Sequence, residues 1–370
     1  MTGTVLVVGT GLIGTSIGLA LQGHRRVLLA DEHGGRLEAA VGRGAGERWD
    51  GELGADLAIV AVPPRQTAAV LTDLLRRQVS RNLTHVASTQ TQVERDLEAL
   101  GAETSTICGG HPLAGREVTG PGGATARLFE GRPWVACPLP DTSDEVVAAV
   151  TALAVACGAE PMVMTPAAHD RAVAVSSHLP QVVASALGAR LLEADAAAVR
   201  VSGPGLQDTT RIAASDAGLW TDVLSANAAQ VAPLVAGLAD DLRRVAEALT
   251  VLAGEGDRAG AAELLREVLV RGNAGRALVP VKRGVLDRDV AVVAVRVPDR
   301  PGRLADLLVR AAAAGVNVED IRVEHLAGRQ TGVVELVVRS AHQKPLAAAL
   351  AESGHEVLGS DVRSTGDLFT

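Results

Sequence analysis

Short apolar runs alternate with helical patterns over the first 165 residues of the chain. The helical stretches include Gln66–Arg77 and Glu145–Cys157. The apolar runs are rich in β-branched residues and lie at Val5–Val8, Val27–Ala30, Leu57–Val62, His85–Ser88, Thr106–Gly109 and Trp134–Ala136. Strands that alternate with helices predict a doubly wound, mostly parallel sheet. Residues 1–165 are therefore expected to form one α/β domain of the Rossmann type.

The strand signal disappears between residues 166 and 283. Long patterns rich in Ala, Leu and Val replace it, at Pro180–Ala194, Leu219–Leu252 and Arg258–Gly272. They predict an all-helical domain, and helices this apolar usually bury a face against a partner, so a homodimer is expected. The glycine-rich and basic segment Gly272–Gly284 is expected to be a linker.

A third pattern covers residues 289–363. Its predicted elements are strand Val290–Val297, helix Leu304–Ala314, strand Val316–Glu324, strand Val333–Val338, helix Gln343–Ser353 and strand Glu356–Val362. The order βαββαβ is that of a small ferredoxin-like α+β domain. The sequence thus predicts three domains, at 1–165, 166–283 and 289–363.

Charge and composition narrow the functional classes. The chain of 370 residues has 35 basic and 43 acidic side chains, a net charge of −8, which does not favour binding to nucleic acid or to an anionic membrane. Any anionic substrate must therefore be met by locally placed cations. Cys108, Cys137 and Cys157 show neither metal-ligand spacing nor an even count, so no metal site and a reducing cytoplasm are expected. No signal or membrane-spanning segment is expected.

The turn after the first strand carries the pattern GxGxxG, at Gly9, Gly11 and Gly14. A strand precedes it, an apolar helix follows from Leu12 and Ile13, and a second strand comes next, which is the fingerprint of a dinucleotide-binding βαβ unit. Gly9 permits the tight turn, Gly11 lets the backbone approach a pyrophosphate, and Gly14 allows close packing of helix on strand. The free N–H groups at the helix N-terminus favour an anion. A glycine-rich structural turn in another α/β fold is the alternative.

Asp31 stands at the end of the second strand, where an acidic side chain accepts hydrogen bonds from the ribose hydroxyls of a dinucleotide. A carboxylate there repels the extra phosphate of NADP, so NAD is the expected cofactor. Val62 and Pro63 end a later strand at the same edge of the sheet and are expected to line the cofactor cleft.

His111 is the candidate catalytic base. It follows the predicted strand Thr106–Gly109, and Pro112 biases it towards an extended backbone at the carboxyl edge of the sheet. A histidine with an ordinary pKa near ~6.5 can take a hydroxyl proton at neutral pH. Other histidines are expected at surface, loop or helix-packing positions without a role: His24, His33, His85, His169, His325, His342 and His355.

Four ordered motifs resemble the prephenate/arogenate dehydrogenases of tyrosine biosynthesis. They are the nucleotide loop at 9–16, a GHPLAGREVTG segment at 110–120, an SHLP segment at 177–180, and a GLQDTTRIA run at 205–213 that precedes Ser215, Asp216 and Trp220. The resemblance covers nearly the whole chain. It implies NAD-dependent oxidative decarboxylation of a cyclohexadienyl acid.

The resemblance also implies roles for single residues. His111 would accept the hydroxyl proton of the substrate, and Ser88 would orient that hydroxyl. Arg211 offers a planar guanidinium that can hold a carboxylate, and His178 could donate a hydrogen bond to a substrate oxygen. A helix-surface ion pair and a packed core histidine are the structural alternatives for these two.

The chain departs from the family pattern at two positions. Gln90 stands where the family often has Lys, and Gln181 stands where the second histidine of the SHLPH motif faces the substrate. These changes leave open whether the substrate is the keto acid prephenate or the amino acid arogenate.

The C-terminal segments Val297–Leu304 and Gly315–Ile321 resemble an ACT domain, a regulatory module that binds amino acids. Pro301 and Gly302 would form the ligand-binding turn, with tyrosine as the expected effector. Retention for oligomerisation alone is the alternative.

Two other functions remain open for the whole chain. One is a related hydroxyacid dehydrogenase, against which the absence of any lysine before Lys282 counts. The other is a catalytically silent sensor of NAD and an amino acid.

Overall fold

The computed structural model describes residues 3–52, 54–116, 118–254, 256–279, 290–325 and 330–359. They form two compact units, which divide after Leu238. Most of the predicted boundary between the second and third domains, at 280–289, and the predicted strand end at 360–362 lie outside the described residues.

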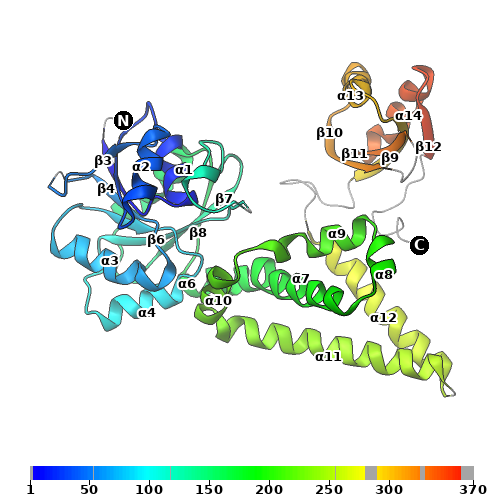
Figure 1. Cartoon of the computed structure of the whole chain (residues 1–370), viewed down its shortest axis with the longest axis horizontal. Helices are drawn as coiled ribbons and strands as arrows, with labels where there is room; N and C mark the ends of the chain where they lie inside the picture. The colour runs from blue at the N-terminus through cyan, green and yellow to red at the C-terminus, as the bar shows by residue number, and fades with distance from the viewer. Residues whose placement is uncertain are drawn as a thin grey trace. The chain divides into compact units, whose positions relative to one another are not determined.

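An eight-stranded sheet forms the centre of the first unit, in the order β3-β2-β1-β4-β5-β6-β7-β8 (Figure 1). Its strands are β1 (Thr4–Val8), β2 (Arg26–Ala30), β3 (Glu47–Arg48), β4 (Leu57–Val60), β5 (Leu83–His85), β6 (Ile107–Pro112), β7 (Pro133–Pro138) and β8 (Glu160–Val163). Only the β6–β7 pair is antiparallel among the described strands of this sheet. The predicted doubly wound, mostly parallel sheet is confirmed.

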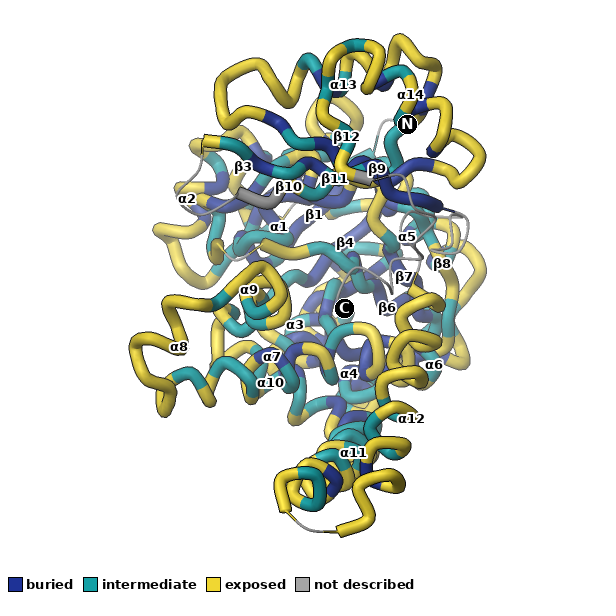
Figure 2. Tube along the Cα trace, turned by 90° about the vertical axis from the view of Figure 1, so that its right-hand side faces the viewer, coloured by how far each residue is buried: buried dark blue, intermediate teal, exposed yellow. Residues whose placement is uncertain are grey.

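Two apolar cores sandwich this sheet, because successive residues of a strand point to opposite faces. Val5 and Val7 pack with α1 (Leu12–Ala20) and α2 (Gly34–Gly42). Leu6 packs on the other face with α3 (Pro64–Arg76) and α4 (Thr91–Ala99). Burial on both faces explains why the parallel strands read as continuous apolar runs, and Figure 2 shows β1 and β4 largely in the colours of buried and intermediate residues.

Two predicted strands have different bounds in the structure. The strand predicted at His85–Ser88 is β5, which ends at His85, so Ser88 lies in the loop that follows it. The strand predicted to end at Gly109 is β6, which continues to Pro112, so His111 belongs to the strand and pairs with Val135. A proline at a strand end leaves the ladder intact, which is why Pro112 does not stop β6 earlier. The sequence analysis missed β3 and β8.

Helices fill the rest of the first unit and continue into the second. They are α5 (Asp144–Ala156), α6 (Pro166–Val173), the π-helical turn η2 (Ala174–His178), α7 (Leu179–Arg190), η3 (Leu191–Glu193), α8 (Ala196–Arg200), α9 (Pro204–Thr210), η4 (Arg211–Ala214), α10 (Ala217–Ala226) and α11 (Ala228–Ala253). The single helix predicted over Leu219–Leu252 is interrupted at Asn227. The predicted all-helical region after the sheet is confirmed.

Pro180 gives a physical reason for the π-helical turn. Proline has no N–H to donate to the carbonyl four residues earlier, so the helix must widen or kink just before it. The widened turn ends at His178, whose side chain is 1% exposed. The π-helical turn therefore places the candidate residue His178 in the protein interior.

The stretch Pro166–Glu193 is the one part of the described chain that is long and apolar enough, by length and composition, to cross a membrane. It also contains the buried polar side chains of His169, Asp170, His178 and Gln181. Core helices of globular proteins pass the same test, and these buried polar groups favour that interpretation.

The second unit contains α12 (Arg258–Arg276) and a four-stranded antiparallel sheet in the order β10-β11-β9-β12. The linker predicted over Gly272–Gly284 is wrong for its first five residues, which are helical, because a glycine costs a helix only about 1 kcal/mol. The sheet and its helices are β9 (Val290–Pro298), α13 (Arg303–Ala313), β10 (Val318–His325), β11 (Thr331–Arg339), α14 (Gln343–Glu352) and β12 (Glu356–Gly359). The predicted order βαββαβ is confirmed.

Candidate active site

The glycine loop between β1 and α1 forms a cradle without side chains. Gly9 has φ +101°, a left-handed conformation that favours glycine, and a Cβ on it would collide with the carbonyl of Ala61. A Cβ on Gly14 would collide with the carbonyl of Gly9. Among the described residues beyond its own chain neighbours, none comes within 4 Å of the Cβ position of Gly11. Gly11 is the N-cap of α1, and it makes no side-chain cap hydrogen bond. Open space in front of uncapped amides fits a phosphate group.

Asp31 follows β2 at the same edge of the sheet. Its carboxylate accepts hydrogen bonds from the Thr10 N–H at 2.6 Å, the Thr10 hydroxyl at 2.8 Å and the His33 N–H at 2.8 Å. Burial acts to raise the pKa of Asp31, but these hydrogen bonds outweigh it and keep the pKa below its ordinary value. Asp31 is therefore a carboxylate at neutral pH, and it ties the β2 end to the glycine loop.

Three neighbouring strands bring the other predicted residues to this edge. Val62 and Pro63 follow β4, Ser88 follows β5, and His111 is the last residue but one of β6. The strands β4, β5 and β6 are adjacent and parallel, with His85 beside Gly109. Carboxyl ends of parallel strands meet at one edge, where such folds bind their ligands.

A chain of hydrogen bonds leads from His111 into the protein. His111 Nδ1 lies 2.8 Å from His169 Nε2, and His169 Nδ1 lies 2.8 Å from Asp170 Oδ1. The Asp170 carboxylate also accepts the backbone N–H groups of Gln90 and Thr91, each at 2.9 Å. His169 is 0% exposed and Asp170 is 2% exposed, so the chain runs through the interior.

These contacts decide which nitrogen of His111 carries its proton. Burial acts to raise the pKa of Asp170, but hydrogen bonds from His169, Thr91 and Gln90 outweigh it, so the pKa lies below its ordinary value. Asp170 is therefore ionised, and its carboxylate can only accept hydrogen bonds. His169 must then donate from Nδ1 and accept at Nε2. His111 donates from Nδ1, which leaves a lone pair on its Nε2.

His178 has the opposite arrangement. The Asn227 amide nitrogen donates to the Asp170 carbonyl at 2.8 Å and lies 3.1 Å from His178 Nδ1. Because a carbonyl only accepts, the amide nitrogen is the donor in both contacts, and His178 Nδ1 accepts. The proton of neutral His178 is therefore on Nε2. One histidine offers a lone pair and the other an N–H group.

Burial keeps both histidines neutral. It lowers the pKa of His111 to about 3, helped by His169 and His178 and opposed by Asp170. Burial also lowers the pKa of His178, with Asp170 again opposing. His111 is therefore unprotonated across the physiological pH range, with a lone pair free on Nε2, and its low pKa makes it a weaker base than an ordinary histidine.

Gln181 holds the segment that carries Arg211. Its amide nitrogen donates to the Ile212 carbonyl at 3.1 Å and to the Ser185 hydroxyl at 3.3 Å. Arg211 opens the turn η4 and lines a cavity beside residues 113–115, which follow β6. The buried amide of Gln181 thus fixes the backbone next to Arg211, from which the guanidinium side chain extends.

Comparison with known proteins identifies the family of this chain. Residues 17–163 match the description "Prephenate dehydrogenase, nucleotide-binding domain", and residues 165–268 match "Prephenate dehydrogenase, dimerization domain". The chain is 39% identical over 325 residues to the probable prephenate dehydrogenase NovF of Streptomyces niveus, covering 86% of this chain and 90% of that protein. The chain belongs to the prephenate dehydrogenase family.

Solved structures agree with this membership. The prephenate dehydrogenase of A. aeolicus, in complex with hydroxyphenyl propionate and NAD⁺, is 26% identical with a TM-score of 0.62, covering 73% of this chain and 97% of that chain. The arogenate dehydrogenase of Synechocystis is also 26% identical, with a TM-score of 0.59 and coverage of 74% and 98%. Both prephenate and arogenate dehydrogenases are thus similar to this chain.

The sequence analysis missed several polar residues of this prephenate dehydrogenase family site. His169 was expected to have no role, and that expectation is corrected by its contact with His111. His85, also expected to have no role, is a buried residue at the end of β5 rather than one at a surface, loop or helix-packing position. The adjacent pair His169-Asp170 on an apolar helix was the available signal, since a buried charge needs a partner.

Gln90, the first departure from the family pattern, is a buried structural group. It is 1% exposed, and its amide nitrogen donates to the carbonyls of Ala87 and Gly110 at 2.8 and 3.2 Å. A Cβ on Gly109 would collide with its amide oxygen. Gln90 therefore ties the loop after β5 to β6, the strand of His111.

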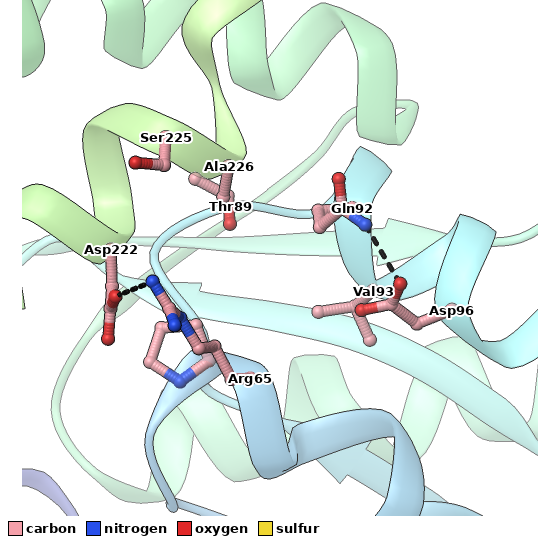
Figure 3. Close-up of a pocket in the computed structure, with 9 residues that line it drawn as sticks. Arg65, Thr89, Gln92, Val93, Asp96, Asp222, Ser225 and Ala226 are labelled. Carbon is pink, nitrogen blue, oxygen red and sulfur yellow. Dashed lines mark hydrogen bonds and ion pairs between the residues drawn. The ribbon is translucent and has the colours of Figure 1, made fainter.

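A second cavity of about 270 Å³ lies between α3, α4 and α10 (Figure 3). Arg65 and Asp222 form an ion pair of 2.6 Å across it, and the Gln92 amide donates to Asp96. Two carboxylates against one guanidinium make this cavity a poor site for a dicarboxylate substrate.

The buried His85 makes stability depend on pH. Burial lowers its pKa to about 3, whereas the unfolded chain has an ordinary value near ~6.5. Between these pH values His85 is protonated in the unfolded state but not in the native state. The free energy of unfolding should therefore fall with falling pH, by up to ~1.4 kcal/mol per pH unit for this residue.

Urea unfolding at about pH 7 and about pH 5 tests this expectation. His85→Asn keeps an acceptor for the Ala87 N–H, which His85 Nδ1 accepts at 3.2 Å, and should flatten the pH dependence. His24→Asn, at an exposed position, is the matched control and should leave the slope unchanged. An equal slope in the wild type and His85→Asn would contradict the prediction.

Proposed function

We propose that this chain catalyses the NAD⁺-dependent oxidative decarboxylation of a cyclohexadienyl acid, prephenate or arogenate, in tyrosine biosynthesis. The observation that carries the proposal is the buried chain His111–His169–Asp170, which leaves the lone pair of His111 Nε2 available at the edge of the sheet. The relatives reported above are named prephenate dehydrogenase or arogenate dehydrogenase, which supports these two substrates.

The cofactor site fits NAD⁺, which supplies the hydride acceptor when bound. The backbone amides at Leu12, Ile13 and Gly14 would hold the pyrophosphate at the N-terminus of α1. The ionised Asp31 would face the ribose hydroxyls and disfavour a 2′-phosphate. Val62 and Pro63 would line the cleft after β4.

His111 would act as the base. Its Nε2 takes the proton of the substrate hydroxyl while hydride leaves the carbon that bears it, which turns that carbon into a carbonyl. The bond to the ring carboxylate then breaks and CO₂ leaves. The released electron pair moves through the ring, which becomes aromatic, to the carbonyl oxygen, and that oxygen takes back a proton from His111. Ser88, in the loop after β5, would orient the hydroxyl.

The other side chains would bind and position. Arg211 would hold a substrate carboxylate by two parallel hydrogen bonds, and His178 would donate from Nε2 to a substrate oxygen. Gln181 would act through the Ile212 carbonyl on the placement of Arg211. His169 would accept from His111 in the ground state and, backed by Asp170, stabilise the imidazolium that forms.

We also propose a cytoplasmic homodimer. Residues 165–268 match a dimerization domain, and large apolar side chains are exposed on the helices after the sheet. Examples are Val175, Leu192, Leu242, Leu249 and Leu269. The three cysteines are free and buried, which suits a reducing compartment.

The described β-sheet unit at the C-terminal end is proposed to be an ACT-like regulatory module for tyrosine. The order βαββαβ supports this, as does Gly302, the N-cap of α13, whose φ of +85° lets the turn after β9 present backbone groups. The related hydroxyacid dehydrogenase and the silent sensor remain alternatives to this proposal. The absence of lysine before Lys282 counts against the first, and the relay behind His111 counts against the second.

His111→Asn should lower turnover by about 10²–10⁴-fold, because the hydroxyl proton loses its acceptor. Formation of reduced nicotinamide with prephenate or arogenate measures it. Binding of NAD⁺ and the thermal midpoint should stay near the wild-type values. Unchanged turnover would remove His111 from the mechanism, and no reduced nicotinamide from the wild type would favour the sensor.

His169 should act on kcat through His111. His169→Leu removes the acceptor for His111 Nδ1–H and should lower kcat about tenfold or more with little change in KM. His169→Gln keeps an acceptor and should recover much of the loss. Nitrogen NMR of the His111 ring should show the Nδ1–H form in the wild type and a mixture in His169→Leu. If the His111 tautomer were the same in His169→Leu as in the wild type, His169 would have only a packing role.

Tyrosine should inhibit the full chain, and Gly302→Ala should raise the tyrosine concentration needed for half-inhibition at least tenfold by distorting the turn. Gly354→Ala is the matched control, because Gly354 also has a left-handed φ, +84°, at the end of a helix. Equal sensitivity of both variants would place the effector elsewhere.

A further inference from the structure

Asn227 lies where one helix ends and the next begins, and its side chain is buried. It is 3% exposed and forms the C-cap of α10, and its own carbonyl accepts the Val231 N–H in the first turn of α11 at 3.1 Å. Helices on both sides therefore fix its backbone. The direction of its side chain is set by the helix junction rather than by a loop.

The amide nitrogen of Asn227 has two acceptors, and both belong to the helical segment that carries His178. It donates to the Asp170 carbonyl at 2.8 Å and to His178 Nδ1 at 3.1 Å. An amide NH₂ group has two protons, so both hydrogen bonds form at once. The Asp170 carbonyl also accepts the Ala174 N–H at the end of α6, so it keeps a partner when the amide of Asn227 is removed.

The Asp170 carbonyl prevents the Asn227 amide from turning over. In the reversed orientation the amide oxygen would face this carbonyl oxygen without a proton between them, and two buried acceptors in contact are costly. His178 Nδ1 therefore always faces an N–H group. A proton on Nδ1 would point at that donor, so the Nδ1–H tautomer and the imidazolium are both disfavoured. The form that fits is the neutral ring with its proton on Nε2.

A second residue of α10 restrains the plane of the His178 ring. Trp220 makes a T-shaped contact with it, with the ring centroids 5.9 Å apart and the planes at 85°. A ring rotated by half a turn would place a C–H group against the Asn227 amide and lose the hydrogen bond. The direction of the Nε2–H group, and not only its presence, thus depends on α10 and its C-cap.

We propose that Asn227 is a positioning residue for substrate binding, which keeps His178 neutral and its Nε2 a hydrogen-bond donor to a substrate oxygen. The inference rests on the proposed function, which gives His178 this donor role. Asn227 acts through His178 and is not a catalytic residue. A hydrogen bond made equally in the bound substrate and in the transition state affects KM and not kcat. Asn227 should therefore act on KM, whereas His169 acts on kcat.

The first test replaces the amide by two methyl groups of the same branched shape. Asn227→Leu should raise the KM of the substrate that is turned over, prephenate or arogenate, about tenfold and change kcat less than about twofold. Asn227→Ser, in which the hydroxyl is too short to reach both acceptors, should act in the same direction, and serine is well tolerated where a helix begins. An unchanged KM in both variants, or a loss in kcat alone, would overturn the inference.

A second background separates this role from general packing. The side-chain nitrogen of glutamine can occupy about the position of a histidine Nε2, and it is a donor in every state. The donor of His178→Gln therefore does not depend on a tautomer. In that background Asn227→Leu should raise KM less than about twofold further. An equal factor in both backgrounds would assign the effect to packing and overturn the inference.

Nitrogen NMR of the His178 ring supplies a readout that needs no turnover. The wild type should show the Nε2–H form, and Asn227→Leu should add the Nδ1–H form or the imidazolium. An unaltered ring spectrum in Asn227→Leu would contradict the inference.

Asn82→Leu is the matched control. The Asn82 amide also donates to a backbone carbonyl, that of Asp56 at 3.2 Å, but Asn82 precedes β5 and so lies at the opposite edge of the sheet from Ser88 and His111. Its replacement should leave KM, kcat and the His178 spectrum unchanged. Binding of NAD⁺ should be the same in Asn82→Leu, Asn227→Leu and the wild type. A rise in KM as large in Asn82→Leu as in Asn227→Leu would overturn the inference.

The outcomes separate this inference from the function it rests on. Normal turnover with a KM that does not respond to Asn227 would overturn the inference and leave the dehydrogenase proposal intact. Absence of turnover with both substrates, in a wild-type protein with a cooperative thermal transition, would contradict the proposed function and the inference together.

Discussion

A carboxylate in the interior of a protein must be met by hydrogen-bond donors, since removing it from water is costly. Asp170, 2% exposed, meets this demand with donors from two separate elements. Its side chain accepts the N–H groups at the start of α4 and the His169 ring, and its backbone carbonyl accepts the Asn227 amide. The loop after β5, the helix α6 and the junction of α10 with α11 are thereby held against one another. The positions of both candidate histidines, His111 and His178, depend on this junction.

The same junction gives two neighbouring histidines opposite chemistry. Through His169 it makes His111 a hydrogen-bond donor on its inner nitrogen and a proton acceptor on its outer one. Through Asn227 it makes His178 an acceptor on its inner nitrogen and a donor on its outer one. Neither role follows from the residue type, because a neutral imidazole can adopt either tautomer. The proposed mechanism needs a base for the substrate hydroxyl and a donor for a substrate oxygen, and these two tautomers would provide them.

The parts of the structure that depend on local pattern could be predicted from the sequence. The glycine loop, the mostly parallel sheet and the βαββαβ unit follow from strand and helix periodicity and from the steric needs of glycine. The parts that depend on tertiary contact could not. In the sequence, His169 looks like an ordinary helix-packing residue. The interruption between α10 and α11 at Asn227 could not be predicted either, because the helical pattern continues on both sides of it. The prediction placed β5 too late in the chain, because Val86 and Ala87 in the following loop are more apolar than Thr84 and His85 in the strand.

The neutrality of Gln90 shows how a buried position can do without a cation. A lysine at position 90 would lie in the interior, where Gln90 is 1% exposed, and would need a carboxylate partner there. The neutral amide satisfies the Ala87 and Gly110 carbonyls at no such cost. The ionised Asp170 carboxylate already has its donors in the His169 ring and in the backbone N–H groups of Gln90 and Thr91. The loop after β5 is thus tied to β6 by neutral hydrogen bonds, and the buried charge behind His111 is balanced in the backbone by donors that carry no charge of their own.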